Sequence, residues 1–114
     1  MYKLFGIPNC DTVKKARQFL ELQGIGVNFI DFKKQPPTEK DLLRWVAAFG
    51  GMPVNKKGQT YKKYKDKFEG LSEKDQILFL KEHSSMIKRP VLEGDSGEVL
   101  SFGFDEESYK TIIS

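Results

Sequence analysis

Residues 2–16 read YKLFGIPNCDTVKKA, and this stretch decides the fold. Residues 2–7 are apolar and rich in strand formers, and the Pro–Asn pair that follows is typical of a turn. Asp11 or Thr12 can cap a helix, because their side-chain oxygens accept hydrogen bonds from its first free N–H groups. The stretch therefore predicts a strand, a tight turn that contains Cys10, and the start of a helix.

The next residues extend this pattern into an α/β unit. Apolar residues recur at helical spacing from Val13 onward, and Gly24 is a suitable C-terminal stop, so we expect a helix over about residues 12–23. Residues 27–32, VNFIDF, read as a second strand. The order strand, helix, strand predicts a parallel pair at the start of an α/β domain.

Helices are expected in the middle of the chain. One opens on a capping box at Thr38, with Asp three residues later, and closes at a Gly–Gly pair. Residues 52–70 look irregular and very basic, with six Lys between positions 56 and 67. Another helix starts at Ser72 and ends near His83.

The last part of the chain predicts a hairpin and a helix. Residues 90–100 contain two short apolar runs on either side of the turn sequence GDSG, which is the pattern of two antiparallel strands. Asp105 is a good cap for a final short helix. The complete layout is strand, helix, strand, two or three helices, two strands and a helix, which is an α/β fold.

Composition excludes several classes of protein. The 114 residues fit one domain, and nine Phe supply core material that a disordered chain lacks. A net charge of +3 is small for a dedicated DNA-binding domain, so we expect no direct nucleic-acid partner. One Cys and one His exclude an internal disulfide, a CxxC pair and a Cys-based zinc site, and no metal is expected.

The expected compartment is the cytoplasm. No apolar run is long enough for a transmembrane helix, and the apolar stretch at the N-terminus is too short for a signal peptide, so no membrane partner is expected. A lone thiol is compatible with a reducing compartment.

Cys10 is the main candidate for chemistry. A helix N-terminus favours an anion by about 0.3–1 kcal/mol, which is less than the ~1.4 kcal/mol of one pKa unit. A reactive thiol here needs nearby cations, which Arg89 and the basic stretch could supply, whereas Asp11 opposes its ionisation. The alternative is a buried structural cysteine.

Three other features have both a functional and a structural interpretation. The bond between Arg89 and Pro90 could be cis, which would fix the direction of an arginine that binds oxyanions or carboxylates; otherwise Arg89 is an ordinary surface residue. The basic stretch could hold an anionic ligand or be a solvated loop. We interpret His83 as structural, because no second base pairs with it, and Trp45 as a core residue.

Five blocks of the chain, in order, resemble the YffB-like branch of the arsenate reductase (ArsC)/Spx family. They are residues 6–16 (GIPNCDTVKKA), 27–34 (VNFIDFKK), 55–62 (NKKGQTYK), 87–92 (IKRPVL) and 103–106 (GFDE). The resemblance implies a thioredoxin-like α/β fold in a single domain of residues 1–114, with a helical insertion at about 37–86.

The resemblance also implies a chemistry. The single active cysteine of the family, at the start of the first helix, corresponds to Cys10. Arsenate reductases of the family use it to attack arsenate and then form a mixed species with glutathione, and they place three arginines around it. Arg89 matches the arginine before the cis proline. The second falls in a region where this chain has only lysines, and the third near residues 103–104, where no arginine is present.

Because lysine reproduces the two-pronged hydrogen bonding of arginine poorly, arsenate is not the substrate we expect. We expect a glutathione-linked thiol reductase or transferase with glutathione as co-substrate and no tightly bound cofactor. The expected partners are glutathione and glutaredoxin, and the expected state is a monomer. The expected catalytic residues are Cys10 and Arg89. The expected glutathione-binding residues are Asn9, Asp11, Thr12, Lys57, Lys62, Lys88 and Pro90.

Two alternatives stay open. One is a genuine arsenate reductase, dependent on glutathione or glutaredoxin, that uses lysines in place of the missing arginines. The other is a non-enzymatic regulator that binds the RNA polymerase α subunit, as Spx does. Redox-sensing Spx proteins carry CxxC at the active position, whereas Cys10 is followed by Asp, Thr and Val, so no resolving cysteine is present.

Overall fold

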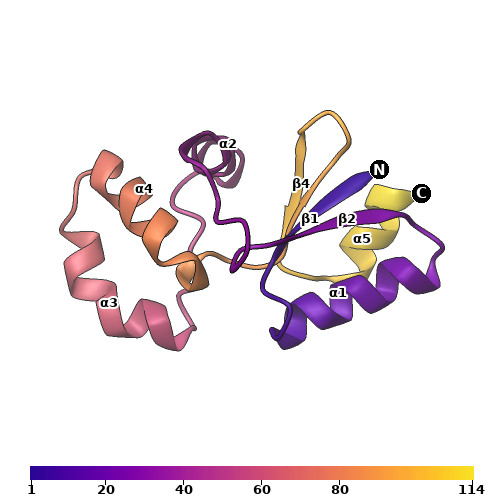
Figure 1. Ribbon diagram of the computed structural model, residues 1–114, viewed down its shortest axis with the longest axis horizontal. Coiled ribbons are helices and arrows are strands. Elements are labelled where there is room, and N and C mark those ends of the chain that lie inside the picture. The colour runs from indigo at the N-terminus through magenta and orange to yellow at the C-terminus, as the bar shows by residue number, and fades with distance from the viewer. The chain divides into compact units, whose positions relative to one another are not determined.

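The opening residues form the predicted strand, turn and helix in the computed structural model, which describes residues 1–114 (Figure 1). Strand β1 spans Tyr2–Gly6, helix α1 spans Asp11–Leu22 and strand β2 spans Val27–Asp31. β1 and β2 pair in parallel, residue for residue along their full lengths. Gly24 follows the helix at φ +71°, a conformation that glycine adopts without strain.

Two further strands complete a mixed sheet. β3 (Val91–Glu93) lies antiparallel to β1, and β4 (Val99–Phe102) lies antiparallel to β3, so the strand order is β2-β1-β3-β4. Helix α5 (Glu106–Ile113) ends the chain, and the side chain of Asp105 accepts the N–H of Ser108, which confirms the predicted cap. The predicted α/β fold class is confirmed.

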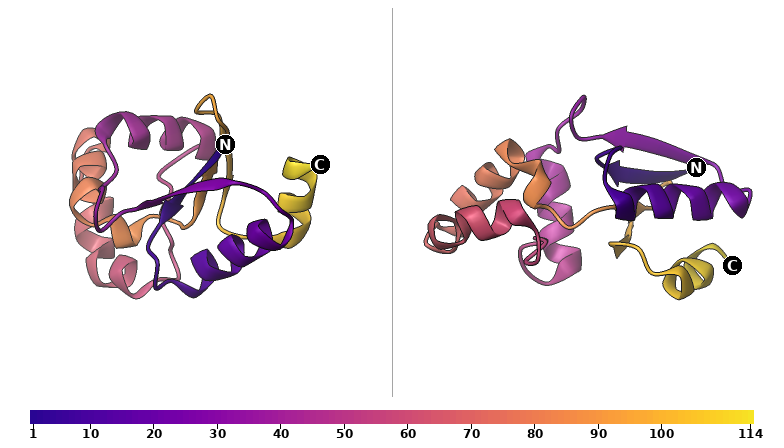
Figure 2. Two further views of the ribbon diagram at one scale, coloured as in Figure 1. Left: turned by 45° about the vertical axis from the view of Figure 1, so that its right-hand side comes forward. Right: turned by 90° about the horizontal axis from the view of Figure 1, so that it is seen from below.

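α1 and α5 pack on the same face of this sheet (Figure 2). Leu4 and Leu92 from the sheet meet three residues of α1 and Tyr109 of α5, all of them buried. Tyr109 is fully enclosed; its O–H donates to the carbonyl of Gly103 at 3.3 Å, and burial raises its pKa to about 12. The α1 contribution follows the helical spacing of the sequence: Ala16, Phe19 and Leu20.

The chain divides into two compact units. The sheet unit contains residues Met1–Gln35 and Arg89–Ser114, and the helical unit contains Pro36–Lys88. The expected single-domain organisation of residues 1–114, with an insertion at about 37–86, stays a prediction.

The helical unit contains three α-helices and a 3-10 turn. They are α2 (Glu39–Phe49), α3 (Gln59–Glu69), α4 (Glu73–Glu82) and η1 (Ser84–Met86). The predicted capping box is present: the hydroxyl of Thr38 accepts the N–H of Asp41, and the Asp41 carboxylate accepts the N–H of Thr38. The side chain of Ser72 caps α4 in the same position, as expected.

Helix α3 corrects one prediction. Residues 52–70 were expected to be irregular, yet 59–69 are helical. Tyr61 and Phe68 are buried at helical spacing, and Tyr64 packs against Phe79 of α4 at 5.3 Å between ring centroids. The lysines between them are exposed. The dense positive charge concealed an amphipathic pattern whose apolar positions are all aromatic.

Gly6 allows the close packing that positions the start of α1. A Cβ at this residue would lie 2.8 Å from Cγ2 of Val13 in α1 and 3.8 Å from Cβ of Pro90, which precedes β3. The contact with Val13 is too short for a methyl group, whereas the distance to Pro90 is an ordinary van der Waals contact.

We predict that Gly6→Ala lowers the free energy of unfolding by about 1–3 kcal/mol, because the added methyl overpacks this contact. Gly70→Ala is the matched control: its Cβ would meet nothing closer than 3.6 Å, and its φ is −83°. Urea denaturation followed by circular dichroism measures both. Equal stability of Gly6→Ala and the control would show that the contact at Gly6 is not tight.

Candidate functional site

Cys10 occupies the N-cap position of α1. Its backbone is extended, with φ −90° and ψ 127°. Its carbonyl accepts the N–H of Lys14 at 2.9 Å, and its own N–H donates to the carbonyl of Ile7 at 3.2 Å. These bonds tie Cys10 to the helix on one side and to the end of the β1 segment on the other. The thiol is free and partly buried.

The prediction that Asp11 or Thr12 caps this helix is wrong, because the helix already begins at Asp11. A cap side chain faces the N–H groups of the second and third helical residues, which here are Thr12 and Val13. The neutral thiol makes no cap hydrogen bond, but both N–H groups stabilise the thiolate. The sulfur therefore stands where a cap oxygen would, at the positive end of the helix.

Arg89, which lies just before β3, reaches the same point. The bond between Arg89 and Pro90 is cis, as predicted. Pro90 is buried and lies against Gly6. The side chain of Arg89 donates a hydrogen bond to the sulfur of Cys10. The two residues expected to be catalytic are therefore in contact, although the whole helical unit separates them in sequence.

Opposing effects set the pKa of Cys10. Burial is the largest single effect and raises the pKa, because a thiolate loses water contact. The N–H of Val13, the hydrogen bond and positive charge of Arg89, and the N–H of Thr12 lower it. Together they hold the pKa below its usual value, which favours the nucleophilic thiolate. Asp11, which we expected to oppose ionisation, is not among the groups that shift this pKa.

The other predicted binding residues fall into two groups, and their part in glutathione binding stays a prediction. Pro90, described above, and three exposed residues before or within the first turn of α1 belong to the sheet unit. Those three residues are Asn9, Asp11 and Thr12. Three exposed lysines belong to the helical unit: Lys57, Lys62 and Lys88.

Sequence reasoning missed the part that Val13 plays. It treated Val13 as a core residue, and the side chain is indeed buried, but the backbone N–H acts on Cys10. Applying the N-cap rule to Cys10 itself would have found this donor, because the third helical residue is the usual partner of a cap.

His83 lies in the helical unit as the C-cap of α4. Its ring stacks on Phe79 with 4.1 Å between centroids, and Nδ1 is 3.1 Å from the Phe79 carbonyl. Across the chain, no group of three His, Cys, Asp or Glu side chains could hold a metal ion. None of the helices has the length and apolar composition needed to cross a bilayer.

The mixed sheet, the helices on one of its faces and the cysteine at the start of α1 define a thioredoxin-like α/β protein. The model of the ArsC family matches residues 5–112, and the chain belongs to this family.

Individual relatives agree with this assignment. YusI of Bacillus subtilis is 30% identical in an alignment of 109 residues that covers 90% of each chain. The solved YffB protein is 33% identical over the whole of both chains, with a TM-score of 0.86. A solved structure described as a possible arsenate reductase from Streptococcus mutans is 27% identical, covers 100% of this chain and 98% of that one, and has a TM-score of 0.81.

We predict that Arg89→Ala slows alkylation of Cys10 by iodoacetamide about three- to tenfold near neutral pH, because loss of the guanidinium raises the pKa of Cys10 and reduces the thiolate population. The deficit should shrink as the pH rises, since the thiol then ionises without help. The measurement is the alkylation rate from about pH 5 to 10 with this uncharged probe.

Lys15→Ala is the matched control, because it removes the same charge from an exposed position of the same helix. Its profile should overlay that of the native chain. An apparent pKa of Cys10 that is unchanged in Arg89→Ala would refute the role of Arg89 in thiolate stabilisation.

Proposed function

We propose that this protein is a glutathione-linked thiol reductase or transferase in which Cys10 is the only nucleophile. The contact between the Cys10 sulfur and Arg89 at the start of α1 carries the proposal, because a helix N-terminus and a guanidinium together favour the thiolate. A cysteine with a purely structural role requires neither the helix N-terminus nor the guanidinium beside its sulfur.

The proposed cycle has two exchange steps. The Cys10 thiolate attacks the glutathione sulfur of a substrate disulfide R–S–S–G, the S–S bond breaks, and the substrate leaves as a thiolate that takes up a proton. Glutathione, as its thiolate, then attacks the glutathione sulfur of the Cys10 mixed disulfide. Oxidised glutathione forms and the Cys10 thiolate is restored. The net reaction is RSSG + GSH → RSH + GSSG, so the thiol of glutathione supplies the electrons.

Cysteine count is the reason to expect an external thiol. The chain has one cysteine, so it has no resolving thiol of its own, and the second step needs a thiol from another molecule. Glutathione carries two carboxylates, for which Arg89 is a suitable partner. A role of the exposed lysines 57, 62 and 88 in glutathione binding stays a prediction from the sequence. Glutaredoxin is a second candidate reductant. Because reduced glutathione is maintained in reducing compartments, the proposal includes a cytoplasmic location for the protein.

Arsenate reduction is the second candidate, and the relative from Streptococcus mutans described as a possible arsenate reductase is the observation that favours it. The arginine content of the chain argues against it. Of the three arginines present, only Arg89 acts on Cys10; Arg44 pairs with Asp41 of α2, and Arg17 covers the ring of Phe29. An arsenate-dependent oxidation of glutathione, catalysed by the purified protein, would support this second candidate.

We predict that oxidised glutathione converts the native protein to a species heavier by one glutathionyl group, on Cys10 alone, and that reduced glutathione reverses it. Intact-protein mass spectrometry measures the rate. Cys10→Ser should stay unmodified, and Arg89→Ala should react more slowly near neutral pH. A Cys10 that reacts no faster than the thiol of an unfolded peptide would count against the proposal.

A further inference from the structure

β2 is an edge strand of the sheet, and its outer side offers backbone hydrogen-bonding groups. The N–H of Phe32 donates to the carbonyl of Gly6 at 2.8 Å, which continues the parallel ladder with β1. Because strand residues alternate, Asn28 and Ile30 face β1 in the same way. The N–H and C=O groups of Val27 and Phe29 therefore point away from the sheet, where a further strand could pair with them.

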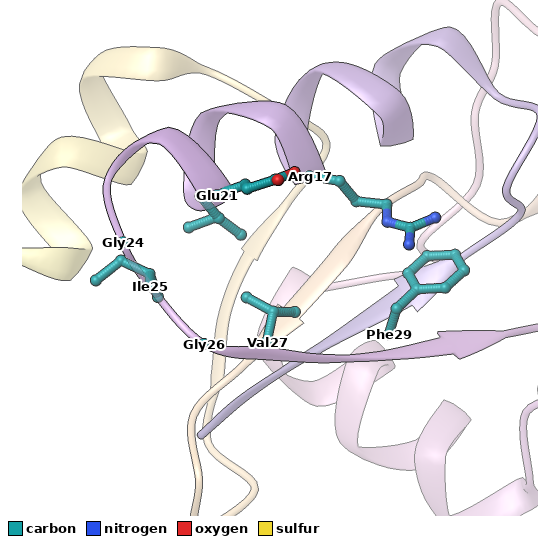
Figure 3. A pocket seen from close by; sticks show the side chains of 8 residues that line it. Arg17, Glu21, Gly24, Ile25, Gly26, Val27 and Phe29 are labelled. Carbon is teal, nitrogen blue, oxygen red and sulfur yellow. The ribbon is translucent and has the colours of Figure 1, made fainter.

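A pocket of about 340 Å³ opens beside this edge, between the end of α1 and β2 (Figure 3). Its apolar lining comes from both elements and from the turn that joins them, and the two glycines of that turn leave it open. Two charged side chains of α1, Arg17 and Glu21, line its rim. The apolar lining residues are Leu20, Ile25, Val27 and Phe29.

The charged groups around the edge are three cations, Arg17, Lys33 and Lys34, and two carboxylates, Glu21 and Asp31. The guanidinium of Arg17 lies 4.2 Å from the centre of the Phe29 ring and is exposed to solvent. Lys33 and Lys34 follow β2 and are also exposed. The carboxylate of Asp31 accepts the N–H of Lys33 at 2.9 Å.

We propose that the outer edge of β2 binds an extended acidic segment of a partner protein as an added strand. The backbone of that segment pairs with Val27 and Phe29. Side chains of an added strand on the α1 side lie next to those of Val27 and Phe29, so an apolar side chain of the segment enters the pocket. A neighbouring carboxylate pairs with Arg17, and further acidic residues face Lys33 and Lys34. This surface does not use Cys10 and is independent of the function proposed above.

A second copy of the chain fits this edge less well. Antiparallel pairing of two β2 strands about Phe29 would bring two Arg17 guanidinium groups together, and like charges across an interface oppose binding. The carbonyl of Asp31, the next outward group, already accepts N–H groups from Lys34 and Gln35. An acidic segment of another protein brings no second Arg17, and it can pair with Val27 and Phe29 without using the carbonyl of Asp31.

The test is selection of peptides by the full-length protein from a phage library of random eight-residue sequences. We expect enrichment of acidic sequences that contain an apolar residue and lack proline. A selected peptide, synthesised and titrated into labelled protein, should shift the amide signals of Val27 and Phe29 most and slow their hydrogen exchange.

Two variants separate the backbone and charge contributions. Val27→Pro removes an outward N–H at the first residue of β2 and leaves the ladder to β1 intact. Arg17→Glu reverses the charge on the rim. Each should weaken the selected peptide at least about tenfold, whereas Lys15→Glu, an equal charge change elsewhere on α1, should not. Cys10 alkylation, unchanged in all three, shows that the fold is kept.

Several outcomes would overturn the proposal. One is a library that yields no acidic extended sequence; another is selected peptides that bind Arg17→Glu as tightly as the native chain. Peptide-induced amide shifts that are confined to elements other than β2 would also overturn it. Concentration-dependent dimers whose interface is β2 would show that a second copy, and not an acidic partner, occupies the edge.

Discussion

The close approach at Gly6 is the constraint on which the sheet unit depends. Gly6 ends β1, and the absence of a side chain lets Val13 of α1 pack directly against the backbone, with Pro90 as a second neighbour. Because Val13 lies in the first turn of α1 and Pro90 comes directly before β3, this contact aligns the start of the helix with the start of a strand. Cys10 directly precedes α1 and Arg89 directly precedes Pro90, so the packing at Gly6 also brings these two residues together.

The site illustrates how weak electrostatic effects combine. The helix N-terminus alone contributes about 0.3–1 kcal/mol to an anion, and burial of the sulfur acts against ionisation. The pKa falls only because two helix N–H groups and one guanidinium act on the same atom. Removing any one donor therefore changes the balance between thiol and thiolate, without removing the nucleophile.

Most of the sheet unit could be predicted because its local signals agree with one another. The turn before Cys10, the spacing from Val13 and the short apolar runs each indicate the elements that form. α3 could not be predicted from composition, because its lysines suggest a solvated loop and only the spacing of Tyr61 and Phe68 indicates a buried face. The cap was assigned one or two residues too late, since cysteine is not among the residues expected there. The edge of β2 and its pocket depend on sheet order, which no local pattern contains.

The separation of Cys10 and Arg89 in the chain also links thiol chemistry to folding. Until the residues after the helical unit have been synthesised and β3 has paired with β1, the thiol lacks the Arg89 guanidinium, which is one of the groups that lower its pKa. Folding lowers the pKa of Cys10, so its ionisation adds stability at pH values above the unfolded pKa, and this contribution is lost as the pH falls through the folded pKa. The electrophile sensitivity of Cys10 is thus a property of the completed fold, and it reports how much of the protein population is native.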